Sequence, residues 1–399
     1  MQIKISSYVP LLVILLTITG CNRNRGIADP LKPGEQHYKP AFAGQTRADT
    51  LKTITPYKVE TVAEHLGRPW AIIPMPNGQL LVTEKSGFMT LHDADGKILK
   101  KITGFPAVND ADQGGMLDVV LDPAFKKNNT IYWVYSEKYG SGNLTTVAKG
   151  QLLPADSVIT NPVVIFRALP EWNSIQHYGS RLAFDKEGYL FLTTGERGKP
   201  ESRMEAQSIK NCLGKVLKIT KEGKPAPGNP FIDSTNAKPE IYSYGHRNPQ
   251  SLAIDPVNGD LWEVEFGPRG GDELNLIKPG KNYGWPIVTY GINYDGKVFG
   301  DAIQQKEGME QPAYYWDPVI SPSGMAFYTS DSIPEWKNNL FISGLTSTRI
   351  VRLQIKDHKV TGEESLLEDK KERIRDVAEL NGKLYAITDS GIMYRISKA

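Results

Sequence analysis

The chain has 399 residues, of which 40% are hydrophobic and 23% charged, and its 47 Lys and Arg against 45 Asp and Glu leave a net charge of +2. So small an excess gives no basic surface field of the kind that binds nucleic acids, and no nucleic-acid partner is expected. Its two cysteines cannot form a disulfide framework, and the ordinary hydrophobic content excludes both a disordered chain and a polytopic membrane protein.

The first 20 residues are typical of a secretory signal peptide. Lys4 precedes an apolar run from Leu11 to Ile18, which is too short for a comfortable membrane span. The motif ITGC at 18–21 resembles the cleavage site of bacterial lipoproteins, in which the cysteine is lipidated and becomes the mature N-terminus. We therefore expect an exported protein, in the periplasm or at the cell surface, that contacts the membrane only through a lipid on Cys21. A plain signal peptide that leaves this cysteine as a free thiol is the alternative.

The segment 21–55 is polar and contains Pro and Gly, which predicts a tether between the anchor and a single folded domain over 56–399. If Cys21 carries lipid, Cys212 has no partner. No disulfide is therefore expected, even in an oxidising compartment.

After residue 55, short apolar runs bounded by turn residues recur, and long helical periodicity is scarce. A paired pattern of an apolar run, a polar turn and a second apolar run appears six times. Gly or Asn in each turn supplies the backbone conformation that a β-hairpin needs. The six predicted hairpins cover residues 71–84, 117–137, 181–196, 252–267, 325–344 and 377–391.

Six antiparallel units at irregular spacing favour an all-β fold, a six-bladed β-propeller, over a pair of β-sandwiches. In a propeller the loops at one mouth converge on the axis, so the functional residues are expected there. Five polar, Gly-rich segments flank the predicted strands and are candidates for one shared site, at 110–117, 175–182, 244–252, 265–275 and 372–377.

His177 is a candidate proton acceptor, because it lies in one of these segments just before a predicted strand and a neutral imidazole accepts a proton near pH 7. A structural role, in which His177 braces its loop by hydrogen bonds, is the alternative.

Three arginines suit an anionic ligand. Arg247 precedes Asn248, and a guanidinium beside an amide suits a planar ligand with several carboxylates; an inter-blade salt bridge is the other interpretation. Arg373 and Arg375 alternate along one predicted strand and point to the same side, where an anion would fit between them. Asp376 and the acidic residues before Arg373 could instead neutralise both cations.

The segment 265–273 is irregular and Gly-rich, with carboxylates at its ends, and oxygen donors of this kind suit calcium. A solvated acidic turn is the alternative, because the segment has no EF-hand pattern. The sequence has no zinc-spaced Cys/His cluster, no G-x-S-x-G elbow and no Walker motif, and GPRGGDE lacks the strand-to-helix context of a dinucleotide fingerprint. NAD and ATP are therefore not expected.

Taken in order, these motifs resemble the soluble quinoprotein sugar dehydrogenases, the glucose/sorbosone dehydrogenase family that uses pyrroloquinoline quinone. The resemblance runs from about Val62 to Ile396. Its best pieces are GRPW at 67–70, QGG at 113–115, HYGSR at 177–181, GHRNP at 245–249, GP and GDELN within 267–275, and NYGWP at 282–286. It implies a six-bladed propeller with the quinone at one mouth, which oxidises the anomeric carbon of an aldose sugar to a lactone and passes electrons to an acceptor that the sequence does not identify.

The resemblance also implies roles for individual residues. His177 matches the base that takes the proton of the anomeric hydroxyl. The positions that match cofactor contacts are Gln113, Arg247, Asn248, Asp272, Tyr294, Arg373 and Arg375. The carbonyls of Gly267 and Pro268 match ligands of the calcium that polarises the quinone, and Glu273 and Tyr283 match a second, structural calcium.

Two positions depart from the family pattern. Phe266 stands where a polar His or Gln usually precedes Gly-Pro, and Thr346 stands where a Lys often follows Leu. Loss of a cation beside the quinone is expected to weaken its binding. Two other functions therefore stay open: a non-catalytic propeller of the same family that binds carbohydrate or protein, and a calcium-dependent hydrolase of the lactonase kind. The hydrolase is disfavoured, since its metal-binding carboxylates on several blades are not evident.

Overall fold

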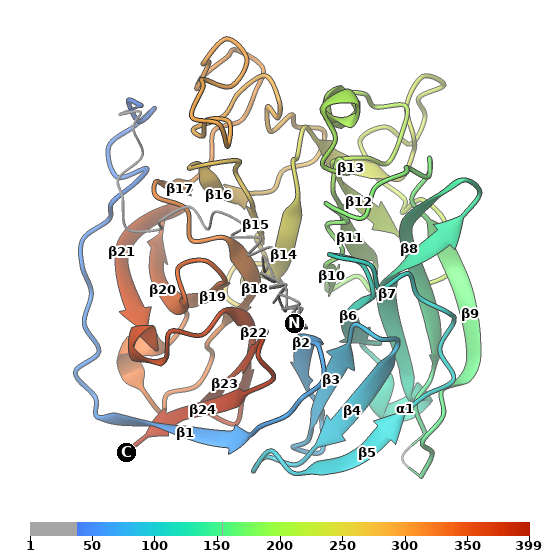
Figure 1. Cartoon of the computed structure of the whole chain (residues 1–399), viewed down its shortest axis with the longest axis vertical. Coiled ribbons are helices and arrows are strands. Elements are labelled where there is room, and N and C mark those ends of the chain that lie inside the picture. Colours follow the sequence, from blue (N-terminus) through green and yellow to red (C-terminus); the bar gives the residue numbers. More distant parts are fainter. Residues whose placement is uncertain (1–37, 154) are drawn as a thin grey trace, which may run out of the picture.

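The computed structural model describes residues 38–153 and 155–399, and these form six four-stranded antiparallel sheets around a central axis (Figure 1). The all-β fold and the six-bladed propeller predicted from the repeats are confirmed. In the first five blades the strands follow the chain outward from the axis, so each blade begins with its innermost strand.

The strands of the first three blades span about half of the described chain. Blade 1 consists of β2 (Pro69–Pro74), β3 (Leu80–Glu84), β4 (Phe88–His92) and β5 (Ile98–Ile102). Blade 2 consists of β6 (Met116–Leu121), β7 (Thr130–Tyr139), β8 (Gly142–Gln151) and β9 (Thr160–Arg167). Blade 3 consists of β10 (Leu182–Phe184), β11 (Leu190–Thr194), β12 (Lys215–Ile219) and β13 (Ile241–Tyr244).

The remaining blades complete the ring. Blade 4 consists of β14 (Pro249–Ile254), β15 (Leu261–Glu265), β16 (Asp272–Leu276) and β17 (Tyr314–Trp316). Blade 5 consists of β18 (Pro322–Phe327), β19 (Leu340–Gly344), β20 (Arg349–Lys356) and β21 (Lys359–Leu366). Blade 6 consists of β22 (Ile374–Leu380), β23 (Lys383–Thr388), β24 (Met393–Lys398) and β1 (Tyr57–Ala63).

The part of the chain that the structure describes has few helices, and they are short. They are α1 (Phe125–Asn128) and the 3₁₀ segments Pro200–Ala206, Pro334–Trp336 and Glu368–Lys370. Among the described residues, no helix has the length and apolar character needed to cross a membrane.

Each of the six predicted hairpins is the inner pair of strands of one blade: β2–β3, β6–β7, β10–β11, β14–β15, β18–β19 and β22–β23. The ring closes through β1, which pairs antiparallel with β24 so that Tyr57 lies opposite Lys398. An N-terminal strand thus completes a sheet whose other three strands are C-terminal, which leaves no open seam in the ring.

Apolar side chains hold the blades together. Six clusters each fill one gap between neighbouring blades; Met89 of blade 1 and Trp133 of blade 2 belong to one of them, for example. Alternation along each strand directs one set of side chains to the preceding blade and the other to the following blade. The loops at the mouths of the ring are therefore carried on a rigid frame.

The tether expected over residues 21–55 needs correction in its last part. Gln45 is buried and its amide donates to the carbonyl of Pro312 at 2.9 Å, and Thr50 forms a parallel bridge with Glu363. Thr53 donates to Glu364 at 2.7 Å. This segment lies against blades 4 and 5 because its polar groups find partners there. Residues 1–37, with the signal peptide and Cys21, lie outside the described residues.

Candidate active site

Loops from all six blades surround a polar cavity of about 560 Å³ at one mouth of the ring. The predicted site residues that line it are Gln113, His177, Arg247, Gly267, Pro268, Asp272, Tyr294, Arg373 and Arg375. Segments that are far apart in the sequence therefore do form one shared site, as the pattern of flanking loops predicted.

Buried ion pairs near the axis join the inner strands of three blades. Arg181 contacts Asp118 at 3.2 Å and Asp376 at 3.1 Å, and its guanidinium lies 4.2 Å from the centre of the Trp70 ring. Trp70 in turn lines the cavity. The alternative in which Asp376 neutralises Arg373 and Arg375 does not hold, because its carboxylate is turned inward to Arg181.

His177 is fixed on three sides. Its Nδ1 lies 2.9 Å from Oε1 of Glu196, its backbone N–H donates to Gln113 Oε1 at 2.8 Å, and its carbonyl accepts from Arg197 at 3.2 Å. A Cβ at Gly195 would lie 2.3 Å from that carbonyl, so only glycine permits this approach of the loop to β11. Because Nδ1 faces a carboxylate, we assign the proton to Nδ1, which leaves Nε2 as a proton acceptor.

The charge state of this pair follows from its surroundings. Burial and the positive charge of Arg247 lower the pKa of His177 below its ordinary value, although Glu196 acts in the opposite direction. Burial tends to raise the pKa of Glu196, but the hydrogen bond to His177, the charges of His177 and Arg247 and the backbone N–H of Gly198 together outweigh burial, and the net shift is downward. At neutral pH the pair is therefore a neutral imidazole held by a carboxylate, the state that a general base requires.

Arg247 projects into the cavity from the loop before β14. Its Nη1 donates to the carbonyl of Phe266 at 3.3 Å and its Nη2 to the hydroxyl of Tyr294 at 3.5 Å. Its Nε is buried without a hydrogen-bond partner. An arginine with an unpaired buried N–H beside a cavity is suited to bind an anionic ligand, because the N–H can donate to it. The inter-blade salt bridge considered for Arg247 is not what the structure shows.

Arg373 and Arg375 face the cavity from blade 6 and share one carboxylate. Arg373 Nε lies 2.9 Å and Arg375 Nε 2.7 Å from the oxygens of Asp389, a residue that the sequence analysis did not identify. Burial would raise the pKa of Asp389, but the two guanidinium groups bring it below its usual range. Two cations against one anion leave a surplus positive charge at this wall of the cavity.

Asp272 acts on the backbone around it. Its carboxylate accepts hydrogen bonds from the backbone N–H groups of Gly267 at 2.8 Å, Ile320 at 2.8 Å and Ser321 at 2.7 Å. Burial nevertheless raises its pKa to about 7. The turn it supports is tight, since a Cβ at Gly267 would lie 2.2 Å from the carbonyl oxygen of Gly270. Asp272 thus positions the Gly267-Pro268 backbone at the cavity wall.

Three predicted site residues lie behind the cavity. Asn248 is fully buried, and its side-chain oxygen accepts from the N–H of Gly179 at 3.1 Å, which ties two site loops together. Glu273 and Tyr283 lie between blades 3 and 4, where the Tyr283 ring stacks on His246 at 4.7 Å and its hydroxyl donates to the Leu276 carbonyl at 2.6 Å.

The two departures from the family pattern do lie at the cavity. Phe266 and Thr346 both line it, and the Thr346 hydroxyl is 2.6 Å from that of Ser321. Lys85 also lines it, although the sequence analysis did not single it out, and burial lowers its pKa to about 8. The cavity thus has a lysine on blade 1, at position 85, although it has none at position 346 on blade 5.

Comparison with known proteins agrees with this arrangement. The Glucose / Sorbosone dehydrogenase family matches residues 66–395. The chain belongs to this family. Within the family, it is 40% identical over 345 residues to the aldose sugar dehydrogenase YliI of Escherichia coli, an alignment that covers 85% of this chain and 92% of that protein.

Solved structures of family members show the same fold. The soluble aldose sugar dehydrogenase of Escherichia coli, in its apo form, superposes with a TM-score of 0.82 at 38% identity, covering 86% of this chain and all of that one (100%). The PQQ-bound aldose sugar dehydrogenase of Streptomyces coelicolor superposes with a TM-score of 0.70 at 29% identity, covering 87% of this chain and 99% of that one. The resemblance read from the ordered motifs is confirmed.

Proposed function

We propose that this member of the glucose/sorbosone dehydrogenase family oxidises the anomeric carbon of aldose sugars with pyrroloquinoline quinone, and that His177 is the general base. The observation that carries the proposal is the convergence on one cavity of a neutral histidine, held by Glu196, and three arginines. The names and the bound quinone of the relatives support the same substrate and cofactor class.

The cavity's donors fit the quinone, a planar molecule with three carboxylates. Arg247, Arg373 and Arg375 are permanent cations, and the unpaired Nε of Arg247 lacks the acceptor that a carboxylate would provide. The backbone oxygens of Gly267 and Pro268 are hard ligands that suit calcium at the same wall. When bound, the quinone accepts hydride and the calcium polarises it as a Lewis acid.

Residues of the chain supply the general base and the groups that orient it. His177 Nε2 accepts the proton of the anomeric hydroxyl, while Glu196 holds the proton on Nδ1 and stabilises the imidazolium that forms. Arg197 donates to the carbonyls of His177 at 3.2 Å and Ser174 at 2.6 Å, which fixes the loop during proton transfer. Burial and, after it, the charge of Arg247 lower the pKa of His177 and so favour the neutral form of the resting imidazole.

The direct experiment is reconstitution. Purified protein is titrated with pyrroloquinoline quinone and calcium, and aldose oxidation is followed with a dye as electron acceptor. We expect saturable quinone binding and aldose-dependent dye reduction. Sugar binding without turnover would favour the non-catalytic propeller, and metal-dependent ester hydrolysis would favour the lactonase-like hydrolase. Within the described chain, the His/Glu group close enough for a metal does not line the cavity, which gives the hydrolase no support.

Replacing Glu196 by Gln is expected to lower kcat by about 10–100-fold, as for other residues that orient a reactive group. The amide can place the imidazole proton on Nε2, and loss of the carboxylate charge lowers the pKa of His177 further. The acid limb of the pH–rate profile should therefore move to lower pH. Ser202→Ala, which removes a 3.3 Å contact to Glu196 together with the contacts of the same hydroxyl to the Lys199 backbone but keeps the carboxylate, is the control. An unchanged rate and profile for Glu196→Gln would show that the pair has no part in turnover.

Removal of calcium is expected to lower the melting temperature of the protein. Besides the cavity site, we propose a second calcium held by Glu273 and the backbone carbonyl of Tyr283, since the Tyr283 hydroxyl is already engaged. An ion bound only by the native state at about 100 times its Kd contributes about 2.7 kcal/mol. Chelator should lower the transition measured by calorimetry, and calcium but not magnesium should restore it. A transition insensitive to chelator contradicts both sites.

We further propose that the protein is exported and anchored by lipid on Cys21. Mass spectrometry of the mature protein is expected to show cleavage before Cys21 and an acylated cysteine, and Cys21→Ser should abolish acylation. An unmodified N-terminus at another residue would refute the anchor. The physiological electron acceptor is then a molecule that reaches the membrane surface.

A further inference from the structure

The gap between blades 3 and 4 holds acidic side chains beside its apolar ones. Along β15, Trp262 and Val264 pack into the cluster shared with blade 5, so alternation turns Leu261, Glu263 and Glu265 toward blade 3. Register places Glu263 opposite Asn275 and Glu265 opposite Glu273 on β16. Three glutamates and an amide thus lie together on the side of blade 4 that faces blade 3.

These carboxylates are close together and buried. Glu263 is fully buried and Glu265 is 3% exposed. The three carboxylates gather around one neutral amide, because the Asn275 nitrogen lies 3.1 Å from Glu263, 3.4 Å from Glu265 and 3.5 Å from Glu273. A buried carboxylate whose charged neighbours are other carboxylates needs a proton or a cation to be stable.

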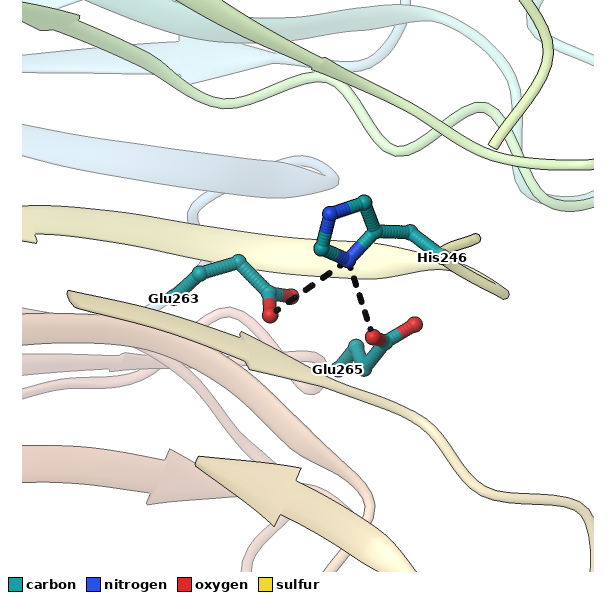
Figure 2. Close-up of side chains that lie close together, drawn as sticks. All are labelled: His246, Glu263 and Glu265. Atoms are coloured by element: carbon teal, nitrogen blue, oxygen red, sulfur yellow. Dashed lines mark hydrogen bonds and ion pairs between the residues drawn. The ribbon is translucent and has the colours of Figure 1, made fainter. Parts of the chain in front are cut away.

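His246 completes the group (Figure 2). Its Nδ1 lies 3.1 Å from Oε1 of Glu265 and 3.9 Å from Oε2 of Glu263, and the ligand atoms of all three residues lie within 4.8 Å of one another. On the other side of the ring, Nε2 lies 2.8 Å from the hydroxyl of Ser243. A metal bound to Nδ1 would leave the imidazole proton on Nε2, where the Ser243 hydroxyl can accept it, as second-shell partners do at metal sites.

Two oxygen atoms in the group have no partner. Oε1 of Glu263 and Oδ1 of Asn275 are buried without a hydrogen bond, while the Asn275 amide donates to the other oxygen of Glu263 at 3.1 Å. An unpaired buried carboxylate oxygen is costly, and the position of Glu263 beside a histidine and a second carboxylate points to a missing cation.

We propose that His246, Glu263 and Glu265 bind a divalent transition-metal ion such as zinc between blades 3 and 4. One imidazole nitrogen with carboxylate oxygens suits zinc better than calcium, which takes oxygen ligands. Metal–ligand bonds of about 2.0–2.2 Å in a tetrahedral site separate the ligand atoms by about 3.3–3.6 Å, close to the spacing around Nδ1. Small side-chain adjustments bring the set together.

The ion would also position the cofactor wall of the cavity. Oε2 of Glu265 accepts from the backbone N–H groups of Arg247 at 2.5 Å and Asn248 at 3.2 Å. A metal that fixes Glu265 and His246 therefore fixes the loop that presents Arg247. The site is distinct from the calcium proposed at Glu273 and the Tyr283 carbonyl, because it uses a nitrogen ligand and other carboxylates.

Metal analysis of the full protein tests this inference. Protein produced with added zinc is dialysed against zinc-free buffer that contains calcium, and both metals are counted by mass spectrometry. We expect about one zinc per chain that survives dialysis, because the ligands are buried. Glu263→Gln should lose the zinc and keep the calcium. Glu240→Gln, which alters another largely buried glutamate, bonded to Cys212, is the matched control and should keep both.

The melting temperature gives a second readout. With zinc bound, Glu263→Gln should lower the melting temperature, because a metal ligand is lost. With no metal in the site, a proton takes the place of the cation on Glu263, so the neutral Gln should leave the melting temperature nearly unchanged. Absence of zinc from the parent protein overturns the inference, and this result can be obtained even if Glu263→Gln does not accumulate. Zinc retained by Glu263→Gln, or a melting temperature no lower than that of the parent, overturns it as well. Quinone titration is measured separately, so these results do not depend on the proposed dehydrogenase activity.

Discussion

Replacing His177 by Ala should lower the turnover of quinone-saturated protein by about 10²–10⁴-fold, the usual contribution of a general base. Quinone affinity should change little, since the three arginines and calcium hold the cofactor. The wild-type rate should fall as pH drops, because a base works only when unprotonated, and the midpoint should lie below the ordinary histidine value of about 6.5 since burial and Arg247 lower the pKa of His177. Saturated rates measured across pH check both effects.

A second variant guards against a folding defect. His177 has a φ of 48°, a conformation that Asn adopts more readily than Ala. His177→Asn should therefore keep the loop and the melting temperature while losing the base. If His177 only braces its loop, both variants lose stability and cofactor affinity together, with the turnover of the remaining loaded protein unchanged. A saturated rate within a few-fold of the parent removes His177 from the catalytic role.

Replacing Arg247 by Ala should act mainly on quinone binding. A charge-assisted hydrogen bond contributes about 1.5–3 kcal/mol, which corresponds to about 10–150-fold in Kd. Excess quinone should restore part of the activity. Because Arg247 lowers the pKa of His177, its loss should also move the acid limb of the pH–rate profile to higher pH, opposite to the shift expected for Glu196→Gln. Quinone titration followed by rate measurement checks both.

Two further variants show whether the loss of quinone affinity comes from the specific Arg247 contact or from positive charge in general. Arg247→Lys keeps the charge but not the Nε donor, and it should fall between the parent and Arg247→Ala. Arg68→Ala removes another cavity-lining cation that is already paired with Asp110 at 2.9 Å, and it should have a smaller effect. Equal losses for Arg68→Ala and Arg247→Ala would mean that general positive charge, not a specific contact, holds the ligand.

The fold was largely predictable from the sequence because hairpins are local. The run at 181–196 carries its own alternation and its own turn, and such units recur at every blade. The attachment of Gln45 and Thr50 to blades 4 and 5 was not predictable, because it depends on polar partners such as Pro312 and Glu363, more than 260 residues away.

Site residues that belong to a sequence motif could be predicted. Site residues that only the folded ring brings to the cavity could not. His177, Arg247 and Arg373 stand in recognisable segments and line the cavity. Glu196 and Asp389 follow ordinary strands, and only the assembled ring brings them to His177 and to the arginines. A carboxylate near the end of a strand has no sequence signal that separates a site residue from a solvated one.

The central claim is tested most directly by mixing quinone-loaded protein with an aldose in the absence of any other acceptor and following the absorbance of the bound quinone. One turnover should reduce the chromophore rapidly with the parent protein and about 10²–10⁴-fold more slowly with His177→Asn. A quinone spectrum that aldoses leave unchanged in the parent protein, or that changes equally fast in both proteins, would contradict the account.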